Sequence, residues 1–271
     1  MKSSSQPRQQ PTVQESIDQL GPWFHNLHLP DGTQTAPNHF LGDYPWFKWQ
    51  ELAPAIPQDL SGWTALDIGC NAGFYSFELA RRGACVTGVD RDLRYLTQAR
   101  WAAGQFHMED RVQFRQMQVY DLAHTEERFD LVLFMGVFHH LRYPMLGLDI
   151  AAQKTRRLMV FQTLMMPGQE VYENTFDQGI HDRQPLNDPG WPKMAFIEHR
   201  FAGDPTNWWI ANRAGAEAML RSAGLRVISQ PSHEMLLCEP DPANPSCMAS
   251  WNLPEFLSAT GQPWNADPQA S

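Results

Sequence analysis

Short apolar runs alternate with segments of helical periodicity through the middle of the chain. The run at 65–68 is followed by a tight turn and then by a segment at 74–82 with helical character, which ends before Gly83. A second β-rich run covers 85–89 and stops at Asp90. Because parallel strands are joined by crossover helices, this order predicts a βαβ unit.

The same alternation continues towards the C-terminus. The predicted helices cover 92–106, 144–152 and 214–223, and the predicted strands cover 111–117, 129–135, 157–164, 225–229 and 234–238. The run at 129–135 is apolar throughout, which is typical of a strand buried on both faces. The pattern therefore predicts one α/β domain over residues 58–240.

The ends of the chain follow other patterns. Residues 1–12 are rich in Ser, Gln and Pro, which predicts a disordered tail, and 241–271 reads as an irregular C-terminal tail. Residues 13–57 combine short helices at 13–20 and 49–56 with many aromatic side chains. Such a segment carries too much apolar area to leave in water. We expect a cap that braces the flank of the domain, covers the ligand site, or does both.

A long interruption separates the fifth predicted strand from the last helix. It covers residues 165–212 and is rich in proline and tryptophan. Connections of this length are uncommon inside a compact domain and are usually functional. The pattern predicts a lid or inserted cap.

Composition narrows the class of protein. The chain has 271 residues and a net charge of -9, which argues against a broad surface for nucleic acid. The four cysteines show no CxxC spacing, which favours reduced thiols. No apolar stretch has the length of a membrane span, and the polar N-terminus does not resemble a signal peptide. We therefore expect a cytoplasmic protein with no membrane partner.

The turn after the first strand carries the strongest chemical signal. Its spacing is D-x-G-x-N-x-G, formed by Asp67, Gly69, Asn71 and Gly73. This turn lacks the final glycine of the G-x-G-x-x-G pattern, which accommodates a pyrophosphate. Asn71 occupies the middle position, and asparagine tolerates the left-handed backbone that such a turn needs. Asp90 ends the second strand, where an acid suits a ribose diol, although it could also be a plain surface acid. A ribose without a pyrophosphate points to S-adenosylmethionine.

The stretch 65–90 resembles the first motif of class I S-adenosylmethionine-dependent methyltransferases. The later segments FDLVLFMGVFHHLRYP and NWWIANRAGAEAMLRSAGL are similar to parts of the family that carboxymethylates the wobble uridine of tRNA. The resemblance extends from about residue 46 to residue 238. It implies a Rossmann-like methyltransferase fold, with a seven-stranded, mostly parallel sheet flanked by helices and, here, an aromatic-rich cap.

The resemblance also implies roles for single residues. The implied cofactor-binding residues are Asp67, Gly69, Asn71, Gly73, Asp90, Arg91, Val119, Tyr120, Met135 and Gly136. The turn residues, Met135 and Gly136 would lie at the methionine end of the cofactor. Asp90 would bind the ribose, and the remaining three would lie around the adenine.

Two departures from the family concern the transferred group. His139 stands where the family has a tyrosine that would touch a carboxylated cofactor. The family's WRKGPF stretch corresponds to PWFHN at 22–26, which has neither Arg nor Lys. Because a carboxylate would be poorly held without a cation, we expect ordinary methyl transfer from S-adenosylmethionine.

His139 and His140 are the candidate catalytic bases, because they follow the fourth strand at its carboxyl end. Either one could instead be a packed structural histidine, and we give this alternative more weight for His140. The candidate substrate-binding residues are Trp46, His199, Trp208 and Trp209, although the tryptophans could equally be core. The other histidines and acids match no compact metal-ligand spacing, so we expect no metal site.

The sequence thus predicts an enzyme that methylates an oxygen or nitrogen of a small-molecule acceptor. The alternative enzyme is a (carboxy)methyltransferase that modifies a tRNA wobble uridine. A different class is a non-catalytic cofactor-binding partner protein. Retention of Asp67, Gly69, Gly73 and Asp90 argues against that class.

Overall fold

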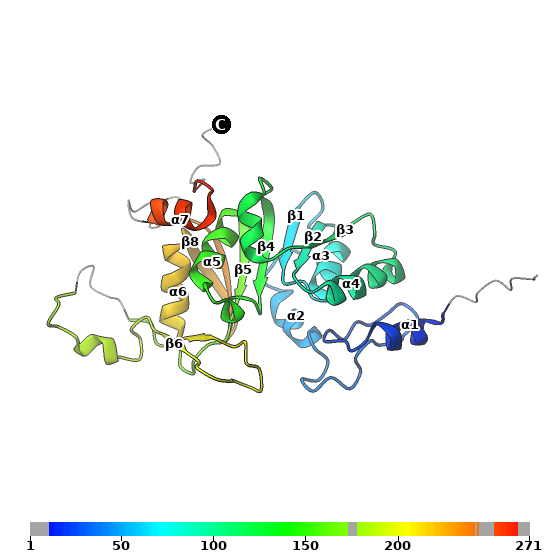
Figure 1. The fold of residues 1–271 in the computed structure, drawn as a ribbon, viewed down its shortest axis with the longest axis horizontal. Coiled ribbons are helices and arrows are strands. Elements are labelled where there is room, and N and C mark those ends of the chain that lie inside the picture. Colours follow the sequence, from blue (N-terminus) through cyan, green and yellow to red (C-terminus); the bar gives the residue numbers. More distant parts are fainter. Residues whose placement is uncertain (1–10, 173–177, 242, 244–251, 265–271) are drawn as a thin grey trace, which may run out of the picture.

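A seven-stranded sheet forms the centre of the molecule, in the order β3-β2-β1-β4-β5-β9-β8 (Figure 1). The computed structural model describes residues 11–172, 178–241, 243 and 252–264. Strands β1 to β5 pair in parallel, and β9 runs antiparallel to both β5 and β8. The predicted α/β architecture with a seven-stranded, mostly parallel sheet is confirmed.

The strands form where the apolar runs predict them. Their bounds are β1 Thr64–Ile68, β2 Cys85–Asp90, β3 Val112–Gln116, β4 Phe129–Met135, β5 Thr155–Gln162, β8 Leu225–Ser232 and β9 Met235–Pro240. Strand β5 ends two residues before the predicted 157–164. Beyond Gln162 the Leu164 amide donates to His139 Nδ1 instead of to a neighbouring strand, which ends the ladder.

Helices cover both faces of the sheet. Phe74–Arg81 (α3) and Leu93–Phe106 (α4) pack on one face, and Pro144–Gln153 (α5) and Arg213–Ser222 (α6) pack on the other. Successive strand residues point to opposite faces. Thus Ala65 joins the cluster under α3 and α4, whereas Leu66 joins the cluster under α5.

The aromatic leader is folded onto the domain. Its first helix, α1 Val13–Leu20, lies against α4, and the Gln98 amide donates to the carbonyls of Leu20 and Pro22. The second helix, α2, covers Trp46–Leu52 rather than the predicted 49–56. It ends there because Pro54 follows the C-cap and cannot continue a helix.

The C-terminal tail contains one element that the sequence pattern missed. Residues Asn252–Thr260 form α7, so the prediction of an irregular tail is wrong for them. Phe256 of α7 is only 5% exposed and packs against Trp264. Phe256 also belongs to the buried cluster on the α5 side of the sheet, and this tertiary packing, which has no local signature, stabilises the helix. Residues 1–10 of the predicted N-terminal tail lie outside the described residues, and Thr12 caps α1.

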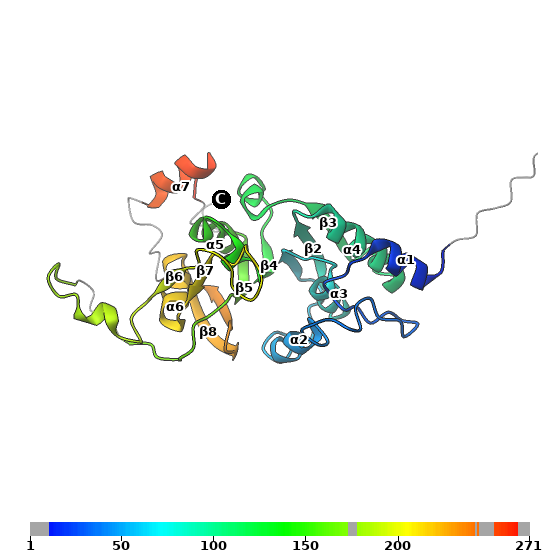
Figure 2. The same ribbon diagram turned by 60° about the horizontal axis from the view of Figure 1, so that its bottom comes forward.

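The interruption after β5 contains a small second sheet and a projecting arm around residues 184–187. Met194–Phe196 (β6) pairs with Trp209–Ala211 (β7), and the 3-10 turn η3 covers Gln184–Asn187. Figures 1 and 2 both show the arm, coloured yellow-green, extending from the end of the molecule away from α1. Two further 3-10 turns, η1 Val119–His124 and η2 Phe138–His140, follow β3 and β4.

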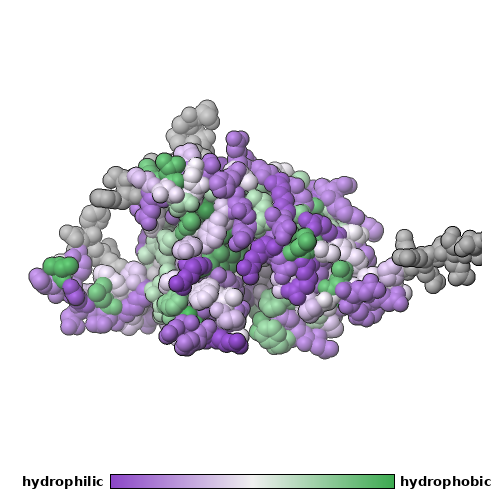
Figure 3. Space-filling model, in the orientation of Figure 1, coloured by the Kyte–Doolittle hydropathy of each residue, from purple (hydrophilic) through white to green (hydrophobic). Residues whose placement is uncertain are grey.

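The molecular surface is mostly hydrophilic on the face shown in Figure 3. Exposed large hydrophobic side chains include Phe40, Leu41, Trp46 and Phe47 of the aromatic leader. Among the described residues, no helix has both the length and the apolar character needed to cross a membrane.

Candidate active site

A cleft of about 680 Å³ opens at the carboxyl ends of β1, β2, β4 and β5. Strand β1 lies between β2 and β4, so the chain reverses its direction of progress across the sheet at this point. Open α/β sheets bind ligands at such switch points, because the loops on either side diverge there.

The predicted cofactor residues converge on this cleft, with the exception of Gly73. The residues of that set that line the cleft are Asp67, Gly69, Asn71, Asp90, Arg91, Val119, Tyr120, Met135 and Gly136. Gly73 lies behind the turn as the N-cap of α3, with φ +85°. A Cβ at Gly73 would come within 2.9 Å of the Phe114 ring, so this glycine permits close packing of the turn.

The glycine turn is held in a fixed shape by its backbone conformation and by Asp90. Gly69 has φ +73°, and a Cβ at that position would lie 2.5 Å from Val137 Cγ2. Asn71 adopts φ 50°, as the sequence predicts for a left-handed position. The Asp90 carboxylate accepts from the amides of Asn71 at 3.0 Å and Asp92 at 2.8 Å, which fixes the turn to the end of β2.

The two acids of the cleft have perturbed proton affinities. Asp67 is 2% exposed and accepts a hydrogen bond of 2.7 Å from the Ser76 hydroxyl. Burial raises the pKa of Asp67 to about 7, and the nearby Asp90 adds to the effect. Burial also raises the pKa of Asp90, against the opposing hydrogen bonds from backbone amides. Asp67 therefore titrates near neutral pH.

The two adjacent histidines have different surroundings. His139 is 6% exposed and does not line the cleft. Its Nδ1 lies 3.1 Å from the Thr163 hydroxyl and accepts from the Leu164 amide, and burial lowers its pKa to about 3. His140 lines the cleft, and burial lowers its pKa as well. From the sequence we expected a structural role for His140 rather than for His139. The structure shows the reverse: His139 is packed, and His140 is the candidate base.

Comparison with known proteins agrees with this geometry. Residues 65–158 match the family described as a methyltransferase domain. The tRNA U34 carboxymethyltransferase of Azotobacter vinelandii is 28% identical over 224 residues, which are 81% of this chain and 63% of that protein. The enzyme of the same name from Pseudomonas paraeruginosa is 28% identical over 256 residues, 92% of this chain and 69% of that one.

Solved structures share the fold. The N-terminal domain of EvdMO1, solved in the presence of SAH and D-fucose, superposes with a TM-score of 0.56 at 22% identity. The match covers 84% of this chain and 95% of that one. Residues 65–158 thus form a methyltransferase domain, and the chain has the fold of S-adenosylmethionine-dependent methyltransferases. Its cofactor is S-adenosylmethionine, and the cleft lined by Asp67, Gly69, Asp90 and Gly136 fits that group.

The candidate substrate residues of the methyltransferase are spread over several places. Trp208 lines the cleft and stacks on Phe196, with ring centroids 6.0 Å apart. Trp209 lies outside the cleft lining and donates to the Leu141 carbonyl. Trp46 stacks on His28 at the surface, and His199 is an exposed side chain beside Glu198. Of this set, the structure brings only Trp208 to the site.

Sequence reasoning missed several residues that line the cleft of the methyltransferase. Phe24, His25 and Tyr44 come from the leader, which therefore both braces the domain and borders the site. His25 is 4% exposed, its Nδ1 has no partner among the described residues, and burial lowers its pKa to about 3. The aromatic run at 22–26 was the available signal. Asp204 and Thr206 also line the cleft, without any sequence signal.

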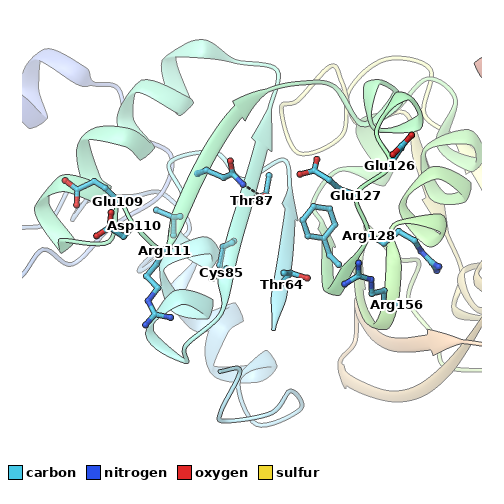
Figure 4. Close-up of a pocket in the computed structure, with 14 residues that line it drawn as sticks. Thr64, Cys85, Thr87, Glu109, Asp110, Arg111, Glu126, Glu127, Arg128 and Arg156 are labelled. Atoms are coloured by element: carbon cyan, nitrogen blue, oxygen red, sulfur yellow. Dashed lines mark hydrogen bonds between the residues drawn. The ribbon is translucent and has the colours of Figure 1, made fainter. Parts of the chain in front are cut away.

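A second hollow lies at the opposite, amino ends of the strands (Figure 4). It measures about 490 Å³ and contains side chains of both charges, including Arg111, Glu127 and Arg156. No predicted site residue lines it. In the described parts of the chain, no group of three or more His, Cys, Asp or Glu side chains is arranged to hold a metal ion.

Proposed function

We propose that this methyltransferase transfers a methyl group to an oxygen or nitrogen of a small-molecule acceptor, with His140 accepting the proton. The observation that carries the proposal is the His140 ring, which lines the cleft and has its Nδ1 bound to the insertion. Its other ring nitrogen is then available to an acceptor.

Residues of the chain fit the cofactor along the cleft. Asp90 would bind the ribose hydroxyls, and Val119 and Tyr120 would flank the adenine. Asp67 and the glycine turn would lie at the methionine end. When bound, S-adenosylmethionine supplies a methyl group already activated on a sulfonium sulfur.

Proton transfer is then the main chemical task left to the protein. Burial lowers the pKa of His140, so its imidazole is neutral at pH 7. A neutral imidazole in hydrogen-bond reach can take the proton of a hydroxyl or an amine as the methyl bond forms. The acceptor's proton then resides on His140.

The size of the cleft favours a small acceptor. A volume of about 680 Å³ lies within the usual range for small-molecule sites, and the cofactor must share it. Two arginines line the cleft: Arg91 follows Asp90 at the end of β2, and Arg142 lies over the Phe196 and Trp208 rings. The fold likeness to a domain solved with D-fucose adds support by analogy only.

A second candidate is modification of a tRNA wobble uridine. The names of the sequence relatives favour it over the first candidate, since those given above are tRNA U34 carboxymethyltransferases. The chain spans 63% of the first of these proteins, and its net charge of -9 is unusual for a tRNA-binding surface.

The donor is tested by calorimetric titration with S-adenosylmethionine. We expect binding in the micromolar range, and a loss of roughly tenfold or more in Asp90→Ala, because a charged hydrogen bond to the ribose is removed. Asp110→Ala, an exposed acid in the second hollow, is the matched control. Absence of micromolar binding by the wild-type protein would contradict the proposal.

The acceptor is tested with methyl-labelled S-adenosylmethionine, offered with a small-molecule extract or with bulk tRNA. We expect label in small molecules by mass spectrometry, and His140→Gln should lower the rate by roughly 10²- to 10⁴-fold without weakening cofactor binding. His124→Gln, exposed on η1, is the control.

Other outcomes decide between the alternatives. Label in tRNA, or transfer only from a carboxylated cofactor, together with salt-sensitive tRNA binding, would favour the second candidate. Cofactor binding with no label in either pool would favour a non-catalytic binding protein.

A further inference from the structure

The insertion after β5 contacts the candidate base directly. Asp204, Thr206 and Trp208 of this segment line the cleft together with His140. The Trp208 amide donates to the His139 carbonyl at 2.9 Å, which ties the segment to the turn that bears both histidines. The segment 204–208 is therefore part of the site and does more than cover it.

One hydrogen bond fixes the tautomer of His140. Its Nδ1 lies 3.2 Å from the Thr206 carbonyl oxygen. A carbonyl oxygen can only accept, so Nδ1 must carry the proton. In the neutral ring the lone pair then resides on Nε2, which has no partner among the described residues.

A second set of contacts links His140 to a carboxylate. Thr206 Oγ1 lies 3.0 Å from His140 Nδ1 and 2.7 Å from Asp204 Oδ1. The Thr206 hydroxyl donates to Asp204, so its oxygen is free to accept from the histidine. The Thr206 amide also donates to Asp204 Oδ1, at 2.7 Å. Both interactions orient the carboxylate.

We propose that Asp204 and Thr206 are positioning residues, which hold His140 with its Nε2 lone pair towards the acceptor and stabilise the ring when it becomes charged. This role rests on the proposed function of His140. In the transfer, the acceptor oxygen or nitrogen would bond to the methyl carbon as the bond from that carbon to the sulfonium sulfur breaks, which leaves a neutral thioether, and the acceptor's proton would pass to Nε2. The Nδ1 proton stays on His140, where it is donated to Thr206, and Asp204 remains a carboxylate throughout.

The charges around His140 agree with this arrangement. Burial lowers its pKa most, Asp204 and the Thr206 carbonyl act to raise it, and Arg91 acts to lower it. His139 also interacts with His140, and burial keeps it neutral. Burial acts to raise the pKa of Asp204, but the hydrogen bonds from Thr206 and the nearby histidines outweigh it and lower that pKa. Asp204 is therefore ionised when His140 is neutral.

His139 supplies an internal contrast. Its Nδ1 accepts from the Leu164 amide, so its neutral form must carry the proton on Nε2. The two adjacent histidines are thus expected to hold opposite tautomers. This difference can be measured without knowing the acceptor.

The test is nitrogen-15 NMR of the full chain labelled in histidine, with His140 assigned by His140→Gln. We expect His140 protonated on Nδ1 and His139 on Nε2 at pH 7.5. Asp204→Asn should lower the pKa of His140, because a neighbouring negative charge is lost. Thr206→Val should disturb the tautomer or pKa, Thr206→Ser should restore both, and Asp188→Asn, elsewhere in the insertion, should change neither.

The results separate this proposal from the proposed function. If His140 carries its proton on Nε2, or if Asp204→Asn leaves its pKa unchanged, the positioning role is wrong even when His140→Gln abolishes methyl transfer. If the NMR results are as expected and His140→Gln keeps full activity, the base role is wrong and with it the catalytic part of this inference. With an acceptor in hand, Asp204→Asn should lower kcat by roughly tenfold with KM unchanged, and shift the pH profile.

Discussion

At the scale of single residues, identical side chains acquire different chemistry from their surroundings. His139 and His140 are adjacent, yet one is enclosed under the insertion and the other lines the cleft. Asp67 and Asp90 end neighbouring strands, and only Asp67 has its pKa raised to about 7. Burial and hydrogen-bond partners decide these roles, because they change the free energy of the charged form.

Asp67 leads to a prediction about pH. Its pKa of about 7 lies above the ordinary value of 3.8, so in the free protein the carboxyl is half protonated near neutrality. A cofactor carrying positive charge should favour the ionised form. We therefore expect affinity for S-adenosylmethionine to rise as the pH increases through 7, with release of a proton on binding.

Calorimetry in two buffers of different ionisation enthalpy measures that proton. Asp67→Asn, which cannot ionise, should bind with little pH dependence and release no proton. Affinity that stays flat from about pH 6 to pH 8 in the wild-type protein would contradict the assignment. In the free protein the same raised pKa costs stability as the pH rises from 3.8 towards 7.

At the scale of elements, the turn between β1 and α3 is the feature on which the cofactor site depends. It combines a left-handed backbone with an approach so close that a side chain at Gly69 would overlap Val137. Val137 belongs to the loop after β4 and also lines the cleft. The contact between Gly69 and Val137 therefore joins the loops that follow β1 and β4.

Gly69→Ala is expected to weaken cofactor binding by roughly tenfold or more and to destabilise the protein by about 1–3 kcal/mol. Gly62→Ala is a matched control, because Gly62 also has a positive φ, of +79°, but nothing lies within 4 Å of its Cβ position. It should cost stability and leave binding intact. Binding and unfolding are measured by calorimetry and denaturant titration. Equal effects of the two variants on affinity would show that the approach to Val137 is irrelevant.

At the scale of the whole molecule, the leader connects the outer helix α4 to the active-site cleft. Gln98 of α4 is fully buried and holds the carbonyls of Leu20 and Pro22. A few residues later Phe24 and His25 line the cleft. The position of this wall therefore depends on contacts made on the flank of the domain.

Gln98→Ala should lower the free energy of unfolding by about 1–3 kcal/mol, since two carbonyls lose a partner. Hydrogen exchange should become faster in residues 20–26, and cofactor affinity should fall. Thr97→Ala, exposed on the same helix, is the control. Unchanged exchange in the leader would show that other contacts hold it.

Much of the architecture follows from the sequence alone. The hydrophobic pattern predicts every strand of the main sheet, from the alternation in β3 to the run in β4, which is apolar almost throughout as a parallel strand buried on both faces requires. The turn around Asn71 and the acid at Asp90 indicate the donor, because their chemistry is local. Helix α7 was missed, because its stability comes from the burial of Phe256 against distant parts of the chain.

The site as a whole was decided only by the tertiary structure. It determined which histidine lines the cleft, placed Trp208 there without Trp209, and brought Asp204 and Thr206 to His140 across more than sixty positions of sequence. Patterns along a sequence report on contacts between near neighbours, such as helix faces and turns. Contacts between distant segments depend on how the whole chain packs, and the residues around His140 belong to that second kind.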